Sequence, residues 1–231
     1  MNTYRKAAII AGIVFIIATA ASLLSTGLTG STTDAPDYLM KISANQDQVM
    51  IGVLLLLIAA FASAGIAIAM YPVMKGANAG LALGSVVFRS LEAVFYLVGI
   101  VSLLSLLTLG GQFTTAAAAD RTTLQAIGNL LVSVHDHAAL VAVFAFCVGA
   151  FMYYTLFFQS RLIPRWLSGF GIVAIILMMA ACVLALFSGN RITSYIPLAF
   201  PIFLQEMIFA VWLIVKGFSP AAIASVPARQ L

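Results

Sequence analysis

Residues 166–187 read WLSGFGIVAIILMMAACVLALF and carry no charged side chain. A helix needs about 20 mostly apolar residues to cross the hydrocarbon layer of a bilayer, which is roughly 30 Å thick, because each residue adds about 1.5 Å. The apolar residues of this stretch run on without the alternation of polar and apolar positions that marks a barrel strand. The stretch therefore predicts a membrane-spanning helix.

The composition of the whole chain agrees with this prediction. The chain is 63% hydrophobic and only 8% charged, whereas a soluble domain carries about 25% charged residues. Lipid must therefore surround most of the molecule. We predict an all-α membrane protein, a bundle of six transmembrane helices at about residues 7–28, 50–74, 81–109, 132–158, 166–187 and 195–215.

The two ends of the chain need separate interpretation. The run 7–28 is longer than the apolar core of a signal peptide, about 7–15 residues, so we expect it to be the first span. Together the six helices form one predicted transmembrane domain over residues 1–218. Residues 219–231 carry prolines and little else, and they predict a disordered cytoplasmic tail.

Lysine and arginine are enriched in the cytoplasmic loops of membrane proteins, so their distribution predicts the orientation of the bundle. One side of the predicted bundle holds Arg5, Lys6, Lys75, Arg161, Arg165, Lys216 and Arg229. The other side holds Lys41, Arg121 and Arg191, together with Asp34, Asp37, Asp47 and Asp120. We therefore predict that the N- and C-termini are both cytoplasmic.

The loop between the first two spans contains a short helical pattern. Asp34 is a suitable helix cap, and Pro36 suits the first turn that would follow it. Tyr38, Leu39 and Ile42 then recur at helical spacing, which predicts an amphipathic segment lying on the membrane surface. A lid over an external opening is the functional alternative.

Charged residues inside a bilayer usually face the interior of a helix bundle or a cavity, because each costs at least about 2.5 kcal/mol. Arg89 and Glu92 are three residues apart in the third predicted span, so they share one helix face. Ser85, Tyr96 and Gly99 extend that face as a polar and small stripe, which we expect to point inward. The pair is interpreted either as a packing ion pair or as a ligand or proton site.

The start of the fourth predicted span reads His135-Asp136-His137. The side chains of two residues that are two positions apart on a helix point in directions about 200° apart. The two histidines therefore cannot bind the same metal ion on an intact helix. His135 continues into a stripe of small residues and is expected to point inward, whereas His137 continues into a lipid-like face. His135 is then a hydrogen-bonded packing residue, a ligand or proton site, or a metal ligand without visible co-ligands.

Glu206 lies near the middle of the sixth predicted span, and Pro201 before it predicts a kink. A kink beside a carboxyl group suits a binding pocket and also suits plain bending of the helix. His135 is expected near the outer interface and Arg89 towards the inner leaflet. The polar residues therefore predict a vertical lining and not a single tight site.

Other functional classes find no support in the sequence. The basic residues lie singly at helix ends, so nucleic-acid binding is not expected. Cys147 and Cys182 lie inside apolar runs and are interpreted as buried small hydrophobic residues. No phosphate-binding loop, HExxH or GxSxG motif occurs. We predict no catalytic residue, no cofactor and no bound metal.

Several of these segments together resemble a known family. The segments are PDYLMKISANQDQV (36–49), FRSLEAVFYLVG (88–99), HDHA (135–138), SRLIPRWL (160–167) and PIFLQEMIFAVWLIVKGF (201–218). In their order and spacing they resemble the bacterial membrane proteins of domain-of-unknown-function family 4386. The resemblance implies six spans in a bacterial inner (plasma) membrane and implies no activity. The matching polar positions are Arg89, Glu92, His135, Asp136, Pro164, Glu206 and Lys216.

The resulting hypothesis is a non-enzymatic membrane protein whose polar lining binds or conducts a small ligand or a proton. The candidate site residues are Arg89, Glu92, Tyr96, His135, Asp136 and Glu206. One alternative is a structural or regulatory membrane subunit, with a membrane-protein partner or a second copy of the chain. Another is an intramembrane metal-dependent hydrolase, for which the required set of three ligands is not evident.

Overall fold

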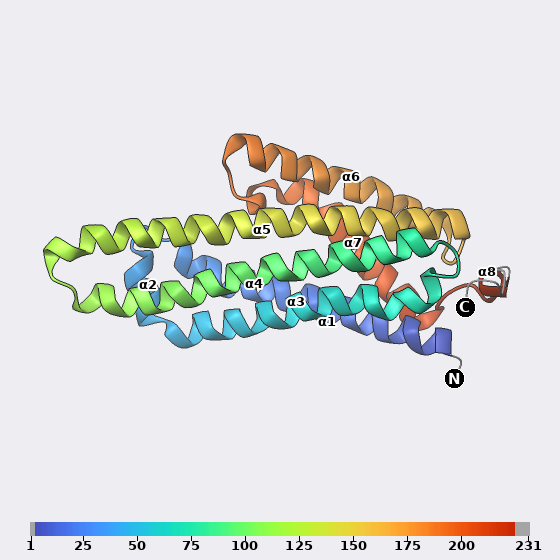
Figure 1. The fold of residues 1–231 in the computed structure, drawn as a ribbon, viewed down its shortest axis with the longest axis horizontal. Helices are drawn as coiled ribbons and strands as arrows, with labels where there is room; N and C mark the ends of the chain where they lie inside the picture. The colour runs from blue at the N-terminus through green and yellow to red at the C-terminus, as the bar shows by residue number, and fades with distance from the viewer. Residues whose placement is uncertain (1–2, 225–231) are drawn as a thin grey trace.

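The computed structural model describes residues 3–224, and within this range the chain is helical without strands. Six of its helices are long and apolar enough to cross a membrane, which confirms the predicted fold class. They run side by side along the long axis of the molecule (Figure 1). Their bounds are α1 (Thr3–Thr33), α3 (Gln46–Met74), α4 (Ala79–Thr115), α5 (Ala118–Ser160), α6 (Arg165–Ser188) and α7 (Ile196–Val215).

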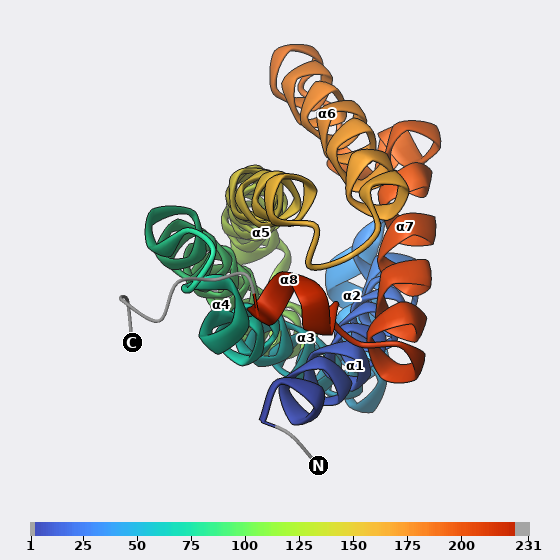
Figure 2. The ribbon, with the colours of Figure 1, turned by 90° about the vertical axis from the view of Figure 1, so that its right-hand side faces the viewer.

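The six long helices form a closed ring. Each packs on the next along the chain, and α7 returns to pack on α1; Figure 2 shows this arrangement from one end. The beginning of α1 and the end of α7 lie at the same end of the bundle, as an even number of spans requires. The orientation of that end towards the cytoplasm stays a prediction.

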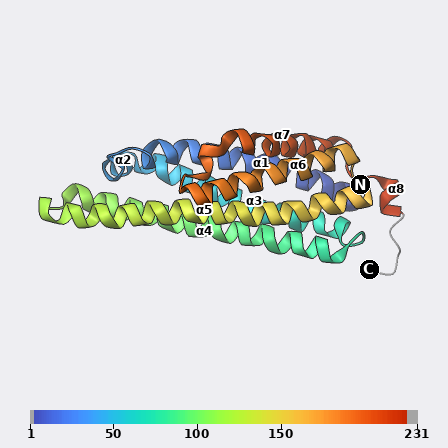
Figure 3. The same cartoon turned by 90° about the horizontal axis from the view of Figure 1, so that it is seen from above.

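The helices differ in length, and this shapes one end of the molecule. α4 has 37 residues and α5 has 43, whereas α6 has 24. The joined ends of α4 and α5 therefore project beyond α6 and α7 (Figures 1 and 3). α5 begins at Ala118, well before the predicted start at residue 132, because residues 118–131 are polar enough for water and still favour a helix.

The short helix α2 (Tyr38–Ala44) corrects the prediction for the first loop. Tyr38, Leu39 and Ile42 are buried in a cluster with side chains of α3 and α4, so the apolar face of α2 covers the bundle and does not lie on lipid. A Cβ at Gly110 would lie 2.9 Å from the carbonyl oxygen of Leu39, which shows how closely α2 approaches α4. Asp34 does not cap this helix, because α2 begins after Asp37.

The start of α1 and the end of α7 contact each other at the opposite end of the bundle. Arg5 of α1 donates hydrogen bonds to the carbonyl oxygens of Leu213, Ile214 and Val215, where α7 ends. A 3₁₀ turn, η1 (Ile192–Tyr195), leads into α7, and a short helix α8 (Pro220–Ala224) follows it. α8 lies within the predicted tail 219–231, and the rest of that tail, 225–231, lies outside the described residues.

Candidate functional site

A cavity of about 400 Å³, the wide cavity, lies between α1, α4, α5 and the segment that joins α6 to α7. Its polar lining comes from three sources: a row of hydroxyl groups on α1, the start of the membrane-embedded part of α5, and Arg191. Apolar side chains such as Leu56, Phe95 and Met178 complete the wall. A volume of this size is typical of sites for small organic molecules.

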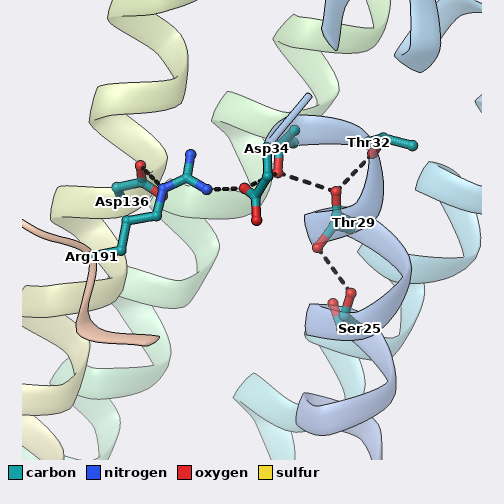
Figure 4. A network of polar contacts seen from close by, with 7 residues as sticks. Ser25, Thr29, Thr32, Asp34, Asp136 and Arg191 are labelled. Atoms are coloured by element: carbon teal, nitrogen blue, oxygen red, sulfur yellow. Dashed lines mark hydrogen bonds and ion pairs between the residues drawn. The ribbon is translucent and has the colours of Figure 1, made fainter. Parts of the chain in front are cut away.

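The hydroxyl groups of α1 follow helical spacing. Ser22, Ser25, Thr29 and Thr33 recur three or four residues apart, so they share one face of the helix. Ser25 donates a hydrogen bond of 2.7 Å to the carbonyl oxygen of Gly52, which holds α1 against α3. Thr29 donates to the carbonyl oxygen of Ser25 at 2.9 Å (Figure 4). This face was not predicted from the sequence, although the spacing of its hydroxyl groups indicates it.

Charged residues from three segments meet at one end of the wide cavity (Figure 4). Nε of Arg191 donates to Oδ2 of Asp136 on α5 at 2.7 Å. The Nη1 group of Arg191 pairs with the carboxylate of Asp34, which follows α1. We call these three residues the Arg191 cluster. Of these three residues, only Asp136 was a predicted site residue. Asp34 was predicted to cap a short helix, and Arg191 was placed on the outer side of the bundle.

A second cavity of about 220 Å³, the narrow cavity, lies between α1, α3, α4, α5, α6 and α7. Arg89, Glu92 and Glu206 line it. Nη1 of Arg89 lies 2.9 Å from Oε2 of Glu92, and the Arg89 guanidinium also lies over the ring of Phe146, 4.8 Å from its centre. Arg89 is 3% exposed and Glu92 4% exposed. The two residues therefore form a buried ion pair within α4.

Some polar atoms at the narrow cavity have no hydrogen-bond partner among the described residues. They include Nε of Arg89 and Oε1 of Glu206, and both are buried. Buried polar atoms are nearly always hydrogen-bonded, because leaving one unpaired costs about 1–3 kcal/mol. Arg89 and Glu206 therefore leave unfilled hydrogen-bonding capacity around one space.

The two cavities adjoin each other. Ser22, Tyr96, Val143 and Met178 line both of them. A polar lining thus runs from the Arg191 cluster past the α1 hydroxyl groups and Tyr96 to the Arg89–Glu92 pair and Glu206. Arg89, Glu92, Tyr96 and Glu206 lie together in the narrow cavity, whereas His135 and Asp136 lie with Tyr96 in the wide cavity.

The two histidines point in different directions. Nδ1 of His135 donates to the carbonyl oxygen of Gly99 on α4, at 3.1 Å, and the His135 side chain lines the wide cavity. His137 is exposed and contacts Ser133 of its own helix. Gly149, further along the His135 stripe, packs so closely on α4 that a Cβ there would lie 3.2 Å from Cγ of Arg89. These positions match the directions expected from the neighbouring residues.

The structure also shows the surroundings of the two cysteines and of the residue types that bind metals. Cys147 and Cys182 are free and buried, as the apolar sequence around them indicates. Among residues 3–224, no three His, Cys, Asp or Glu side chains are grouped closely enough to hold a metal ion.

Comparison with known proteins gives a single result. A family model described as a domain of unknown function, DUF4386, matches residues 10–217. No curated protein and no solved structure matches the chain. The family match covers α1 from residue 10, the other five long helices in full, and every residue that lines the two cavities. The chain therefore belongs to the DUF4386 family.

Proposed function

We propose that this protein binds a small ligand inside the helix ring, in the two adjoining cavities, without transforming it chemically. The observation that carries the proposal is that two buried polar atoms at one cavity, Nε of Arg89 and Oε1 of Glu206, have no hydrogen-bond partner among the described residues. Charged groups are costly inside a bilayer, and they mark ligand or ion pathways more often than packing contacts. The protein acts in the inner (plasma) membrane with both termini in the cytoplasm.

The route to this site starts at the Arg191 cluster. The wide cavity begins there, and the α1 hydroxyl groups continue from it towards the narrow cavity. A purely structural subunit has no use for two adjoining spaces, because a packing role is better served by filled helix contacts. The cavities therefore favour binding over a structural role.

Cysteine labelling tests whether water and solutes reach the site. In a background in which Cys147 and Cys182 are alanine, Ser22→Cys places a thiol on the shared wall of both cavities. Leu24→Cys is the matched control, because Leu24 is 58% exposed on the outside of the same helix, where lipid covers it. A charged, membrane-impermeant methanethiosulfonate is added outside intact cells.

The proposal predicts rapid modification of Ser22→Cys and slow modification of Leu24→Cys. A low-molecular-weight extract of the cells that contain the protein should then slow the modification of Ser22→Cys. Equal and slow modification of the two thiols would show that the cavities are closed to solutes, and the proposal would fail.

A further inference from the structure

We infer that the narrow cavity binds a protonated organic amine that carries an apolar group. This inference rests on the proposed ligand-binding function and names the chemical class of the ligand. It comes from the balance of charge around the cavity, from the unpartnered atoms, and from the apolar remainder of the wall.

The charges at the narrow cavity do not cancel. Glu92 pairs with Arg89 at 2.9 Å, so the Arg89 charge is already matched. Glu206 lines the same cavity, forms no ion pair within residues 3–224, and has a buried Oε1 without a hydrogen-bond partner. Two carboxyl groups therefore face one guanidinium, and a cation bound beside Glu206 would complete the balance.

The wide cavity shows the same imbalance. Asp34 and Asp136 both contact Arg191, so two carboxylates again share a single guanidinium. The other titratable groups that line this space are Tyr96 and His135, and Nδ1 of His135 donates to the carbonyl oxygen of Gly99. Carboxylates in excess along a low-dielectric passage attract cations and repel anions.

The remaining wall defines the rest of the ligand. An ammonium group has three N–H donors. Oε1 of Glu206 is a free acceptor on this wall, and the hydroxyl oxygen of Ser63 on the same wall can accept a second hydrogen bond. Phe203 adds an aromatic ring, which favours a nearby cation, and Ile202 adds apolar surface. Nε of Arg89 offers one donor to an acceptor on the ligand.

A proton on Glu206 would also remove the charge imbalance. It would leave the cavity of about 220 Å³ unfilled, however, and Nε of Arg89 without a partner. An organic cation that carries an acceptor fills the space and can contact both Glu206 and Nε of Arg89. The observations therefore favour the amine.

The first test uses the unmodified protein and three probes that share a phenyl ring and a short spacer. The probes are 2-phenylethylamine, 2-phenylethanol and phenylacetate, which are cationic, neutral and anionic at neutral pH. Calorimetric titration into the protein in lipid nanodiscs, with empty nanodiscs as the blank, measures each affinity. We expect the amine to bind at least roughly 30-fold more tightly than the other two, as for loss of one partner of a buried charge pair.

The second test uses Glu206→Gln, which keeps the shape of the side chain and removes its charge. We expect this variant to lose at least roughly 30-fold in affinity for 2-phenylethylamine. Asp120→Asn is the matched control, because Asp120 is exposed at the start of α5 and lines neither cavity; its affinity should equal that of the unmodified protein. The unfolding temperature of each variant shows whether it is folded.

Each outcome supports or overturns the inference. Equal binding of 2-phenylethanol, undiminished amine binding by folded Glu206→Gln, or no binding of the amine would overturn it. If Glu206→Gln does not fold, the selectivity of the unmodified protein among the three probes decides between support and rejection. Failure of the amine assignment leaves the labelling of Ser22→Cys unchanged, so it is distinguishable from failure of the proposed function.

Discussion

Arg191 and Asp136 are joined by a hydrogen bond of 2.7 Å from Nε to Oδ2, although they are 55 positions apart in the chain. The bond ties the segment between α6 and α7 to α5. Because Arg191 also pairs with Asp34, one side chain holds together three segments that line the wide cavity. We therefore expect the Arg191 cluster to control access to that cavity.

Removal of the guanidinium should open the cavity without unfolding the bundle. Ion pairs near a surface contribute about 1 kcal/mol or less each, and Arg191 is one-third exposed. We expect Arg191→Gln to speed the labelling of Ser22→Cys and to lower the unfolding free energy only slightly. Lys41→Gln, which breaks the exposed contact with Asp37, should leave the labelling rate unchanged. An unaltered rate in Arg191→Gln would argue against control of access by the Arg191 cluster.

The contact between α1 and α7 should tolerate no added atom at Gly12. A Cβ at this position would lie 2.7 Å from the carbonyl oxygen of Ala210, and overpacking of this kind costs about 1–3 kcal/mol. We expect Gly12→Ala to destabilise the protein by that amount in detergent unfolding. Gly27→Ala on the same helix meets nothing within 4 Å and should stabilise the helix by up to about 1 kcal/mol. Equal effects of the two changes would contradict the close approach.

The hydrogen bonds from Arg5 of α1 to the end of α7 should contribute to stability. Arg5 donates to the carbonyl oxygen of Leu213 at 3.0 Å and to that of Val215 at 3.3 Å, and a cation also suits the negative end of a helix dipole. We expect Arg5→Gln to lower the unfolding free energy by about 1–2 kcal/mol and to speed amide hydrogen exchange at the end of α7. Lys6→Gln should change neither quantity, because Lys6 is exposed. Comparable amide hydrogen exchange in both variants would count against this role of Arg5.

Tyr38 of α2 should make the stability depend on pH in the alkaline range. Burial raises the pKa of its phenol above the usual value of about 10, and its hydroxyl donates to Oδ1 of Asn129 at 2.9 Å. Above pH 10 the unfolded chain loses this proton while the folded chain keeps it, so stability falls as the pH rises towards the folded pKa. We expect the unfolding temperature of Tyr38→Phe to fall less between pH 9 and pH 11. Identical pH profiles would show that Tyr38 is not coupled to folding.

The spans and the inward stripe of α4 were predictable because lipid imposes a simple rule. A charged group inside a bilayer must face protein or a cavity, so Arg89 and Glu92 define the inner face of their helix from spacing alone. The small residues after His135 likewise indicate which side of α5 approaches a neighbour. Both inferences depend only on residues within one helix.

The Arg191 cluster and the burial of α2 could not be predicted, because they depend on contacts between segments that are distant in the sequence. Asp34 and Arg191 are 157 positions apart, and each alone is an ordinary charged loop residue. The apolar face of α2 suits lipid and protein equally well, so the sequence did not show that α3 and α4 cover it. Hydropathy likewise marks only the embedded part of a helix, and α5 continues well past that part into water.

The closure of the ring by α7 against α1 has a consequence for biosynthesis. The ribosome delivers the helices in order, so Arg89 and Glu92 enter the bilayer together on one helix and can neutralise each other at once. Glu206 arrives on the last long helix, and the narrow cavity acquires its remaining wall only then. A nascent chain halted before residue 196 would therefore lack α7, so its ring would stay open and its narrow cavity incomplete.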